Sequence, residues 1–121
     1  MKNFTDLFLK NDITNVIPVS GSTSIPINIP QIENLFAIDV KLVCTSTNTG
    51  SKDITFKLRN NDNQYETFAF WDDSTETLFT YEQKLTDRSC SRLYIDVLNN
   101  SGSVTITPKY VHVRFYFENV G

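Results

Sequence analysis

Hydrophobic and polar residues alternate along most of the chain, and the alternation is cleanest near the C-terminus. In residues 109–118 every second position is apolar: Val111, Val113, Phe115 and Phe117. Side chains of an extended strand point alternately to its two faces, so this segment is expected to bury one face and expose the other. A strand so near the chain end is ordered only by pairing, which predicts a central place in a sheet.

The same period of two recurs in shorter segments that polar turns separate. Strands are predicted over residues 36–44, 53–59, 64–71, 77–83, 93–97 and 104–106, with Pro108 breaking the last of these before the closing strand. The turn at residues 60–63 is expected to join its flanking strands in a β-hairpin. Residues 4–10 alternate imperfectly and fit either a first strand or a single helical turn.

Prolines mark two segments in the first 30 residues. Pro18 interrupts the apolar residues 13–19, and residues 25–30 alternate isoleucine with Pro26, an asparagine and Pro30. Proline has no N–H to donate to a ladder, so both segments are expected at a sheet edge or a bulge. The second segment is either a protected edge strand or an arm that docks on a neighbouring subunit. In the latter case the contact residues are Ile25, Ile27 and Ile29.

About eight to ten short strands without a long helical period predict an all-β protein, either an antiparallel β-sandwich or a small barrel. Eight strands suit a jelly roll, and we expect a jelly-roll-like sandwich. Residues 1–121 are expected to form a single domain, with residues 1–30 as a candidate extended arm or edge segment. Composition agrees, because Asn, Ser and Thr fill 36 of the 121 positions and favour turns and strand faces over helix interiors.

The charge excludes one class of partner. The net charge is −3 and the basic residues are scattered, so the basic stripe typical of nucleic-acid binding is missing. The N-terminus has no signal-peptide pattern, and no apolar run is long enough to cross a bilayer. These patterns predict a soluble protein made in the cytoplasm, with neither a nucleic-acid nor a membrane partner. Cys44 and Cys90 are expected to be unpaired thiols.

Few residues suit catalysis or metal binding. His112 is the only histidine, and neither cysteine lies in a nucleophile motif. One histidine and two distant cysteines do not make a zinc site. The polar turns at residues 60–63 and 72–76 could hold calcium, but they lack EF-hand spacing and are interpreted as turns. We therefore predict no catalytic residue, no metal ligand and no cofactor, and a protein that is not an enzyme.

Aromatic residues gather on two adjacent predicted strands, at positions 65, 68, 70, 71, 79 and 81. Both faces of segment 64–71 carry them, so one face must be core and the other is either covered or exposed. A covered or intersubunit face is the preferred interpretation. An exposed face would offer a platform for a sugar ring, with Tyr65 and Trp71 as the platform residues.

The polar face of the closing strand has the composition of a protein interface. It carries Tyr110, His112, Arg114 and Tyr116, and tyrosine and arginine are enriched where proteins meet. A small domain with such a face is expected to pack against other copies of itself.

The Asn/Thr/Ser-rich turns, the missing leader, the segment 20–30 and the ladder of strands together resemble small β-sandwich accessory proteins of bacteriophage or virus particles. These are head-decoration, fibre-attachment and tail proteins. The resemblance implies a jelly-roll or immunoglobulin-like domain that forms trimers or lattices with other virion proteins, in a virion assembled in the host cytoplasm. The leading hypothesis is thus a structural or assembly protein, and the alternative is a carbohydrate-binding or lectin-like module with a glycan as partner.

Overall fold

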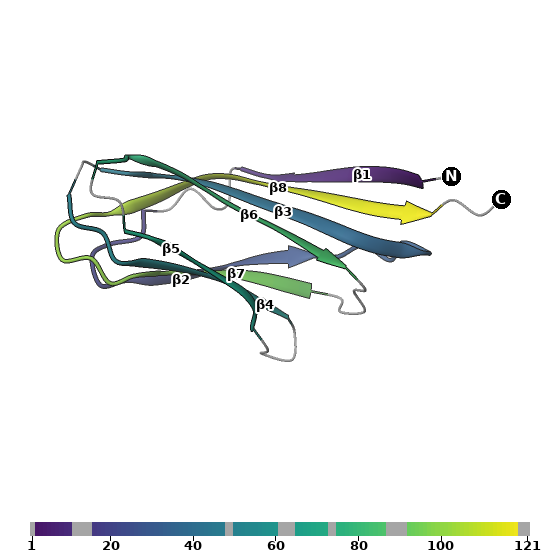
Figure 1. The fold of residues 1–121 in the computed structure, drawn as a ribbon, viewed down its shortest axis with the longest axis horizontal. Helices are drawn as coiled ribbons and strands as arrows, with labels where there is room; N and C mark the ends of the chain where they lie inside the picture. Colours follow the sequence, from purple (N-terminus) through teal and green to yellow (C-terminus); the bar gives the residue numbers. More distant parts are fainter. Residues whose placement is uncertain are drawn as a thin grey trace.

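The computed structural model of the protein describes residues 2–10, 16–47, 50–60, 65–72, 75–86 and 92–118, with the backbone alone at residues 2, 65–68 and 86. These residues form eight β-strands (Figure 1). In chain order the strands are β1 (Lys2–Leu9), β2 (Ser22–Asn28), β3 (Leu35–Ser46), β4 (Ile54–Asn60), β5 (Tyr65–Trp71), β6 (Leu78–Thr86), β7 (Arg92–Asn99) and β8 (Ile106–Glu118).

The strands pair in a nested order. One four-stranded sheet runs β1-β8-β3-β6 and the other runs β2-β7-β4-β5, so the first strand pairs with the eighth, the second with the seventh, the third with the sixth and the fourth with the fifth. Every one of these ladders is antiparallel. A long hairpin rolled into two sheets gives this order, which is a jelly roll. The all-β sandwich prediction is confirmed.

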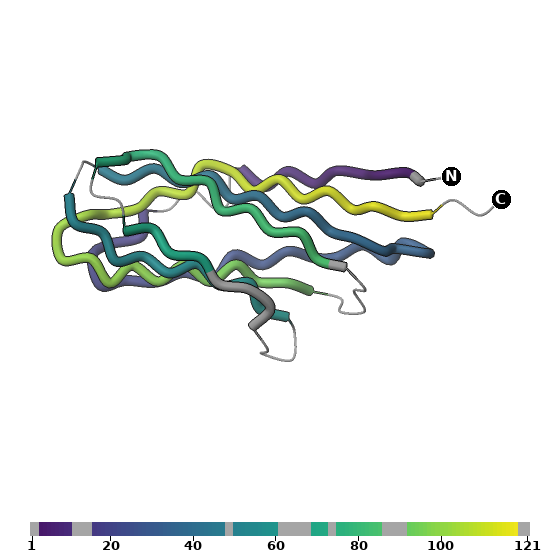
Figure 2. The backbone as a smooth tube through the Cα atoms, viewed as in Figure 1, coloured from purple at the N-terminus to yellow at the C-terminus, as the bar shows by residue number. Residues whose placement is uncertain are grey.

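The core fills the space between the two layers that Figure 2 shows. Strands of both sheets contribute every second side chain to the core. The largest buried side chains include Phe56 on β4 and Tyr81 on β6. The Phe56 ring stacks on Phe79 and Tyr81 with centroids 5.0 and 5.6 Å apart, and Trp71 stacks on Phe79 at 5.2 Å. Because β4 and β5 belong to one sheet and β6 to the other, this aromatic stack ties the two layers together.

The closing strand is central, as predicted, because β8 lies between β1 and β3. The hairpin prediction is also confirmed by the antiparallel β4–β5 ladder. The predicted break at Pro108 is wrong. Pro108 pairs with Cys44 inside β8, and the register shift that leaves Lys109 unpaired forms a bulge. The β1 ladder stops at Val111, so Pro108 has a strand neighbour on one side only and its missing N–H breaks no β1 bond.

Residues 2–9 and 22–28 are both strands of the sandwich. Residues 2–9 form β1 rather than a helical turn, and β2 is an edge strand of the second sheet. Pro26 is exposed on β2, whereas Ile25 and Ile27 are buried in the core and Ile29 packs against it. The alternative in which Ile25 and Ile27 dock on a neighbouring subunit is therefore wrong, since their side chains already fill this protein's own core.

A buried asparagine joins three segments at one end of the sandwich. The Asn99 Nδ2 donates to the carbonyl oxygens of Val104 and Pro18, at 2.8 and 3.1 Å, and its Oδ1 accepts from the Ser101 N–H at 3.1 Å. Each of these backbone groups needs a partner when it is buried. Asn99 thus satisfies polar groups that no strand ladder reaches.

Asn99→Ala is expected to lower the free energy of unfolding by about 2 kcal/mol, because it strips hydrogen-bond partners from buried backbone groups. Urea denaturation followed by circular dichroism measures the change. The neighbouring Asn100 is exposed, so Asn100→Ala is the matched control and should change stability by less than about 0.5 kcal/mol. A wild-type unfolding midpoint in the Asn99 variant would contradict the assigned role.

Candidate functional site: the outer face of the first sheet

The side chains of the β1-β8-β3-β6 sheet that point away from the core form what we call the outer face. The strand registers arrange them in rows across the sheet. The first row is Phe4, Tyr116 and Ala37; the second is Asp6, Arg114, Asp39 and Lys84; the third is Phe8, His112, Lys41 and Glu82. Side chains in one row are close enough to interact, so the register determines which groups meet.

The second row alternates negative and positive charge across the sheet. The Arg114 guanidinium makes a bidentate contact with Asp6, with Nε donating to Oδ1 at 2.7 Å and Nη2 donating to Oδ2 at 3.1 Å. Farther along the row, Asp39 accepts a hydrogen bond from the Tyr116 hydroxyl at 3.0 Å. Opposite charges on neighbouring strands favour their pairing, and a bidentate pair also fixes orientation. This row holds the edge strand β1 in register on β8.

The Asp6 carboxylate stays ionised over a wide pH range. The hydrogen bonds from Arg114 lower its pKa from 3.8 to about 2, although desolvation acts the other way, and a 3.0 Å contact between its Oδ1 and the Nε2 of His112 adds to the lowering. The same pair raises the pKa of Arg114. The hydrogen bond to Asp39 raises the pKa of Tyr116. The Asp6–Arg114 pair is therefore charged near neutral pH.

On one side of the second row lies an aromatic patch, which we define as Phe4, Phe36 and Tyr116. The Tyr116 ring is 6.4 Å from Phe4 and 6.3 Å from Phe36, measured between centroids. Arg114 packs its guanidinium over Phe4 at 4.0 Å, yet Phe4 remains 54% exposed. The patch lies where β1 begins and β8 ends, and Figure 1 shows these two strand ends side by side.

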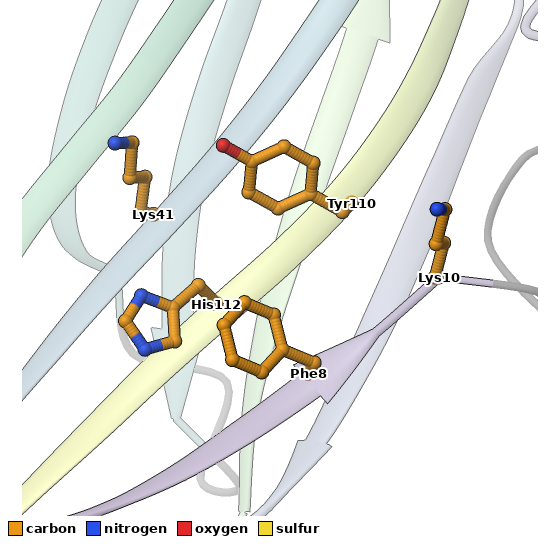
Figure 3. A pocket seen from close by; sticks show the side chains of 5 residues that line it. All are labelled: Phe8, Lys10, Lys41, Tyr110 and His112. Carbon is orange, nitrogen blue, oxygen red and sulfur yellow. The ribbon is translucent and has the colours of Figure 1, made fainter.

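Beyond the other side of the row is a basic hollow, a cavity of about 470 Å³ lined by Phe8, Lys10, Lys41, Tyr110 and His112. The Phe8 ring stacks on the His112 imidazole, with centroids 4.4 Å apart and an interplanar angle of 9°. Phe8 is nevertheless 64% exposed. Figure 3 shows the Tyr110 ring between the two lysine side chains, above the stacked pair. The hollow thus combines aromatic surface with cationic groups.

The outer face of the second sheet differs in character. There Arg59 and Asp96 form a bidentate pair at 2.8 and 3.1 Å, and the Ser24 hydroxyl donates to the same carboxylate at 2.6 Å. The Arg59 guanidinium also lies 4.2 Å from the centroid of the Tyr94 ring. These charged groups bind one another, as Asp6 and Arg114 do on the first sheet.

The structure brings the predicted interface residues together. Tyr110, His112, Arg114 and Tyr116 are half-buried on the outer face. Sequence reasoning missed the residues of β1 that complete this face, which are Phe4, Asp6 and Phe8. Their alternation with the inward Leu7 and Leu9 was the available signal, but the segment also fitted a helical turn.

The structure does not support the alternative of a sugar platform at Trp71. Trp71 is 2% exposed and stacks on Phe79 in the core, with the Lys52 Nζ 5.2 Å from its ring centroid. The side chain of Tyr65 lies outside the described residues. On the opposite face of β5, the Phe70 ring is 66% exposed.

The described part of the chain contains one cysteine, Cys44, which is buried and unpaired. Burial raises the pKa of the Cys44 thiol to about 12, so Cys44 is not a nucleophile near neutral pH. Cys90 lies outside the described residues. Among the residues placed by the structure, no group of three or more His, Cys, Asp and Glu side chains could hold a metal ion.

Within the same residues, no helix is long and apolar enough to span a bilayer.

Comparison with known proteins supports the fold and identifies no family. No protein-family model and no curated protein matches the sequence. Dimeric latent PorU from Porphyromonas gingivalis is similar in structure, with a TM-score of 0.65, 3% identity, and coverage of 97% of this chain and 13% of PorU. VP2 of the infectious bursal disease virus subviral particle has a TM-score of 0.54 and 6% identity, with coverage of 94% and 32%.

A carbohydrate-binding domain is similar at full length. The CBM36-1 domain of a multidomain xylanase from the hindgut metagenome of Trinervitermes trinervoides has a TM-score of 0.54 and 11% identity, and the match covers 98% of this chain and 99% of that domain. Identities this low show a shared fold alone. The chain is therefore a jelly-roll β-sandwich of a kind found both in a viral particle protein and in a carbohydrate-binding module.

Asp6→Asn is expected to change the acid sensitivity of the protein. The pKa of Asp6 is about 2 in the folded protein, below its ordinary 3.8, so its stabilisation is present above about pH 4 and is lost as the pH falls through about 2. Wild type should therefore melt at a higher temperature than the variant at pH 7, with the difference closing near pH 2. Thermal unfolding followed by circular dichroism checks this.

The exposed Asp72 offers the control, since Asp72→Asn removes a carboxylate far from Arg114. This control should follow the wild-type curve at every pH. A melting difference between wild type and the Asp6 variant that is as large at pH 2 as at pH 7 would exclude the bidentate pair as its source.

Proposed function

We propose that the protein is a non-enzymatic structural and assembly module, a virion component such as a phage head-decoration, fibre or tail protein, that works by packing the outer face of its first sheet against other subunits. Self-association and contact with other virion proteins are both part of this proposal. The observation that carries it is the aromatic patch, in which Phe4 is 54% exposed on an edge strand that a charged row holds in place.

The aromatic patch has the composition of an interface centre. Large rings and arginine are enriched where proteins meet, and exposed apolar surface rimmed by polar groups marks interaction sites. Phe4 offers an open ring, and Arg114 and Lys84 lie against the rings of Phe4 and Tyr116. A second subunit that covered Phe4 would bury apolar area while the charged row remained as a polar rim.

The comparison with a viral particle protein adds support of a general kind. VP2 of the infectious bursal disease virus is described as forming a subviral particle, and its similarity covers 94% of this chain at a TM-score of 0.54. A jelly roll presents a rigid sheet face, which suits repeated packing of identical copies. This similarity supports the proposal of a particle component, with a second copy as the first partner to test.

Light scattering across a concentration series tests the proposal. The mass is expected to rise above the 13.9 kDa of one chain as concentration increases, and Phe4→Ser should weaken the association by about tenfold or more, as expected for loss of a central interface ring. Phe70 is a matched control because it is 66% exposed on the other sheet. Phe70→Ser should leave the mass unchanged, whereas a wild-type monomer at every concentration would contradict self-association.

Carbohydrate binding is the second candidate function, and a specific observation favours it. The exposed Phe8 ring borders a hollow that also contains hydrogen-bonding groups, which is the arrangement typical of small-ligand sites. The similarity to the CBM36-1 domain covers nearly the whole of both chains. The platform is thus moved from the Trp71 region to the outer face of the first sheet, where it lies apart from the aromatic patch.

A further inference from the structure

We propose that the basic hollow binds an acidic saccharide, whose carboxylate or sulfate group is held by the cationic side chains while its ring packs on the exposed aromatic surface. The inference rests on the second candidate function and adds the charge of the ligand. It concerns a different part of the outer face from the aromatic patch, because the row of Asp6 and Arg114 lies between them.

The hollow has the size and construction of a small-ligand site. Its volume of about 470 Å³ falls within the usual range of roughly 300–1,000 Å³. Three parts of the first sheet build it: β1 and the residue after it supply Phe8 and Lys10, β8 supplies Tyr110 and His112, and β3 supplies Lys41. The ladders hold the backbone of β1, β8 and β3 in register, so the strand positions of Phe8, His112 and Lys41 are set before a ligand arrives.

The charge of the hollow is opposite to that of the whole protein. Its lining contains two lysines and no carboxylate, while the net charge of the chain is −3. The nearest acids do not line the hollow: Asp6 is bound by Arg114 in a bidentate contact and also lies 3.0 Å from the Nε2 of His112, and Glu82 neighbours Lys41 in the ladder. A local positive site on an acidic protein favours an anionic group over a neutral one.

The aromatic surface in the hollow is suited to a ring. Phe8 stacks face to face on His112 at 4.4 Å, which covers one side of Phe8 and fixes its orientation. The rest of the ring is open, since Phe8 is 64% exposed. The Tyr110 hydroxyl and the lysine ammonium groups add hydrogen-bond donors around it. A saccharide offers both a ring face and hydroxyl groups, so it matches this lining better than an inorganic anion does.

The number of cations limits the class of ligand. Nucleic acids bind through repeated phosphate contacts along a basic stripe, whereas this hollow places two lysines around a single cavity. One or two anionic groups on a small ring are the chemistry that such a cavity can satisfy. Uronic acids, sialylated sugars and sulfated sugars all have this chemistry.

Nuclear magnetic resonance of the imidazole protons gives a direct test, because His112 is the only histidine in the chain and lines the hollow. The probes are trigalacturonate, sialyllactose and a sulfated disaccharide. Each is paired with a neutral counterpart: the methyl ester, lactose and the desulfated disaccharide. Inorganic sulfate is added alone as a bare anion. We expect saturable shifts with at least one acidic saccharide and about tenfold weaker binding of its neutral partner, the loss expected for a charged hydrogen bond.

Variants locate the site. Phe8→Ser and Lys41→Gln are each expected to weaken binding of that saccharide by about tenfold, since each removes one of the two required features. The controls make the same chemical changes on the other sheet, as Phe70→Ser and Lys57→Gln, and should bind like wild type. All four positions lie outside the core, and circular dichroism verifies that each variant is folded.

The outcomes separate the inference from the function on which it rests. Equal binding of an acidic saccharide and its neutral partner overturns the acidic preference but leaves carbohydrate binding in place. Shifts with sulfate alone that match those with a saccharide mean an adventitious ion only, and overturn the inference. No shift with any saccharide up to about 10 mM overturns both the inference and carbohydrate binding. Unchanged affinity in both hollow variants also overturns the inference, because binding then lies elsewhere.

Discussion

The ladder between β3 and β8 is the constraint on which the rest of the structure depends. These strands of 12 and 13 residues lie at the centre of the first sheet, and each carries an edge strand on its other side, β6 on β3 and β1 on β8. Their core residues alternate, so a slip of one residue would turn Val40 and Val113 to solvent and bury Lys41 and His112. Burial of the core therefore fixes the register, and the register fixes which side chains meet on the outer face.

Because of that register, the outer face carries two candidate binding surfaces that differ in chemistry. The charged row that includes Asp6 and Arg114 separates an aromatic patch from a basic hollow. The Asp6 carboxylate stays ionised because the hydrogen bonds from Arg114 lower its pKa. Apolar rings suit a second protein surface, and a ring among cations suits an acidic sugar. The two proposals are compatible, since a particle component can attach through one region and bind a saccharide through the other.

The sequence was sufficient to predict elements whose pattern of apolar and polar residues lies within one short segment. The long strand around residues 36–44, the hairpin and the jelly-roll-like sandwich followed from period-two patterns. The continuation of β8 through Pro108 could not be predicted in this way. A proline breaks a strand only where a neighbouring strand needs its N–H, and the β1 ladder stops before it reaches Pro108. The burial of Trp71 could not be predicted either, because both faces of its strand carry aromatic residues. Only the stack of Trp71 on Phe79 shows which face belongs to the core.

The functional face could be predicted only in part for a similar reason. That His112 and Arg114 share a face is a local fact, but their partner Asp6 is 106 and 108 positions away along the chain. The contact exists only once β1 pairs with β8, and no pattern within either strand specifies that pairing. Non-local pairing, rather than any unusual residue, is what the sequence left open.

Hydroxyl-radical footprinting at low and high protein concentration tests the central claim most directly, because it reports which aromatic rings a neighbouring subunit covers. The account predicts that Phe4 loses reactivity as the protein associates, while Phe70, which is 66% exposed on the other sheet, keeps it. Protection of Phe70 with Phe4 still reactive, or unchanged reactivity at both, would contradict the claim that this face is the contact surface.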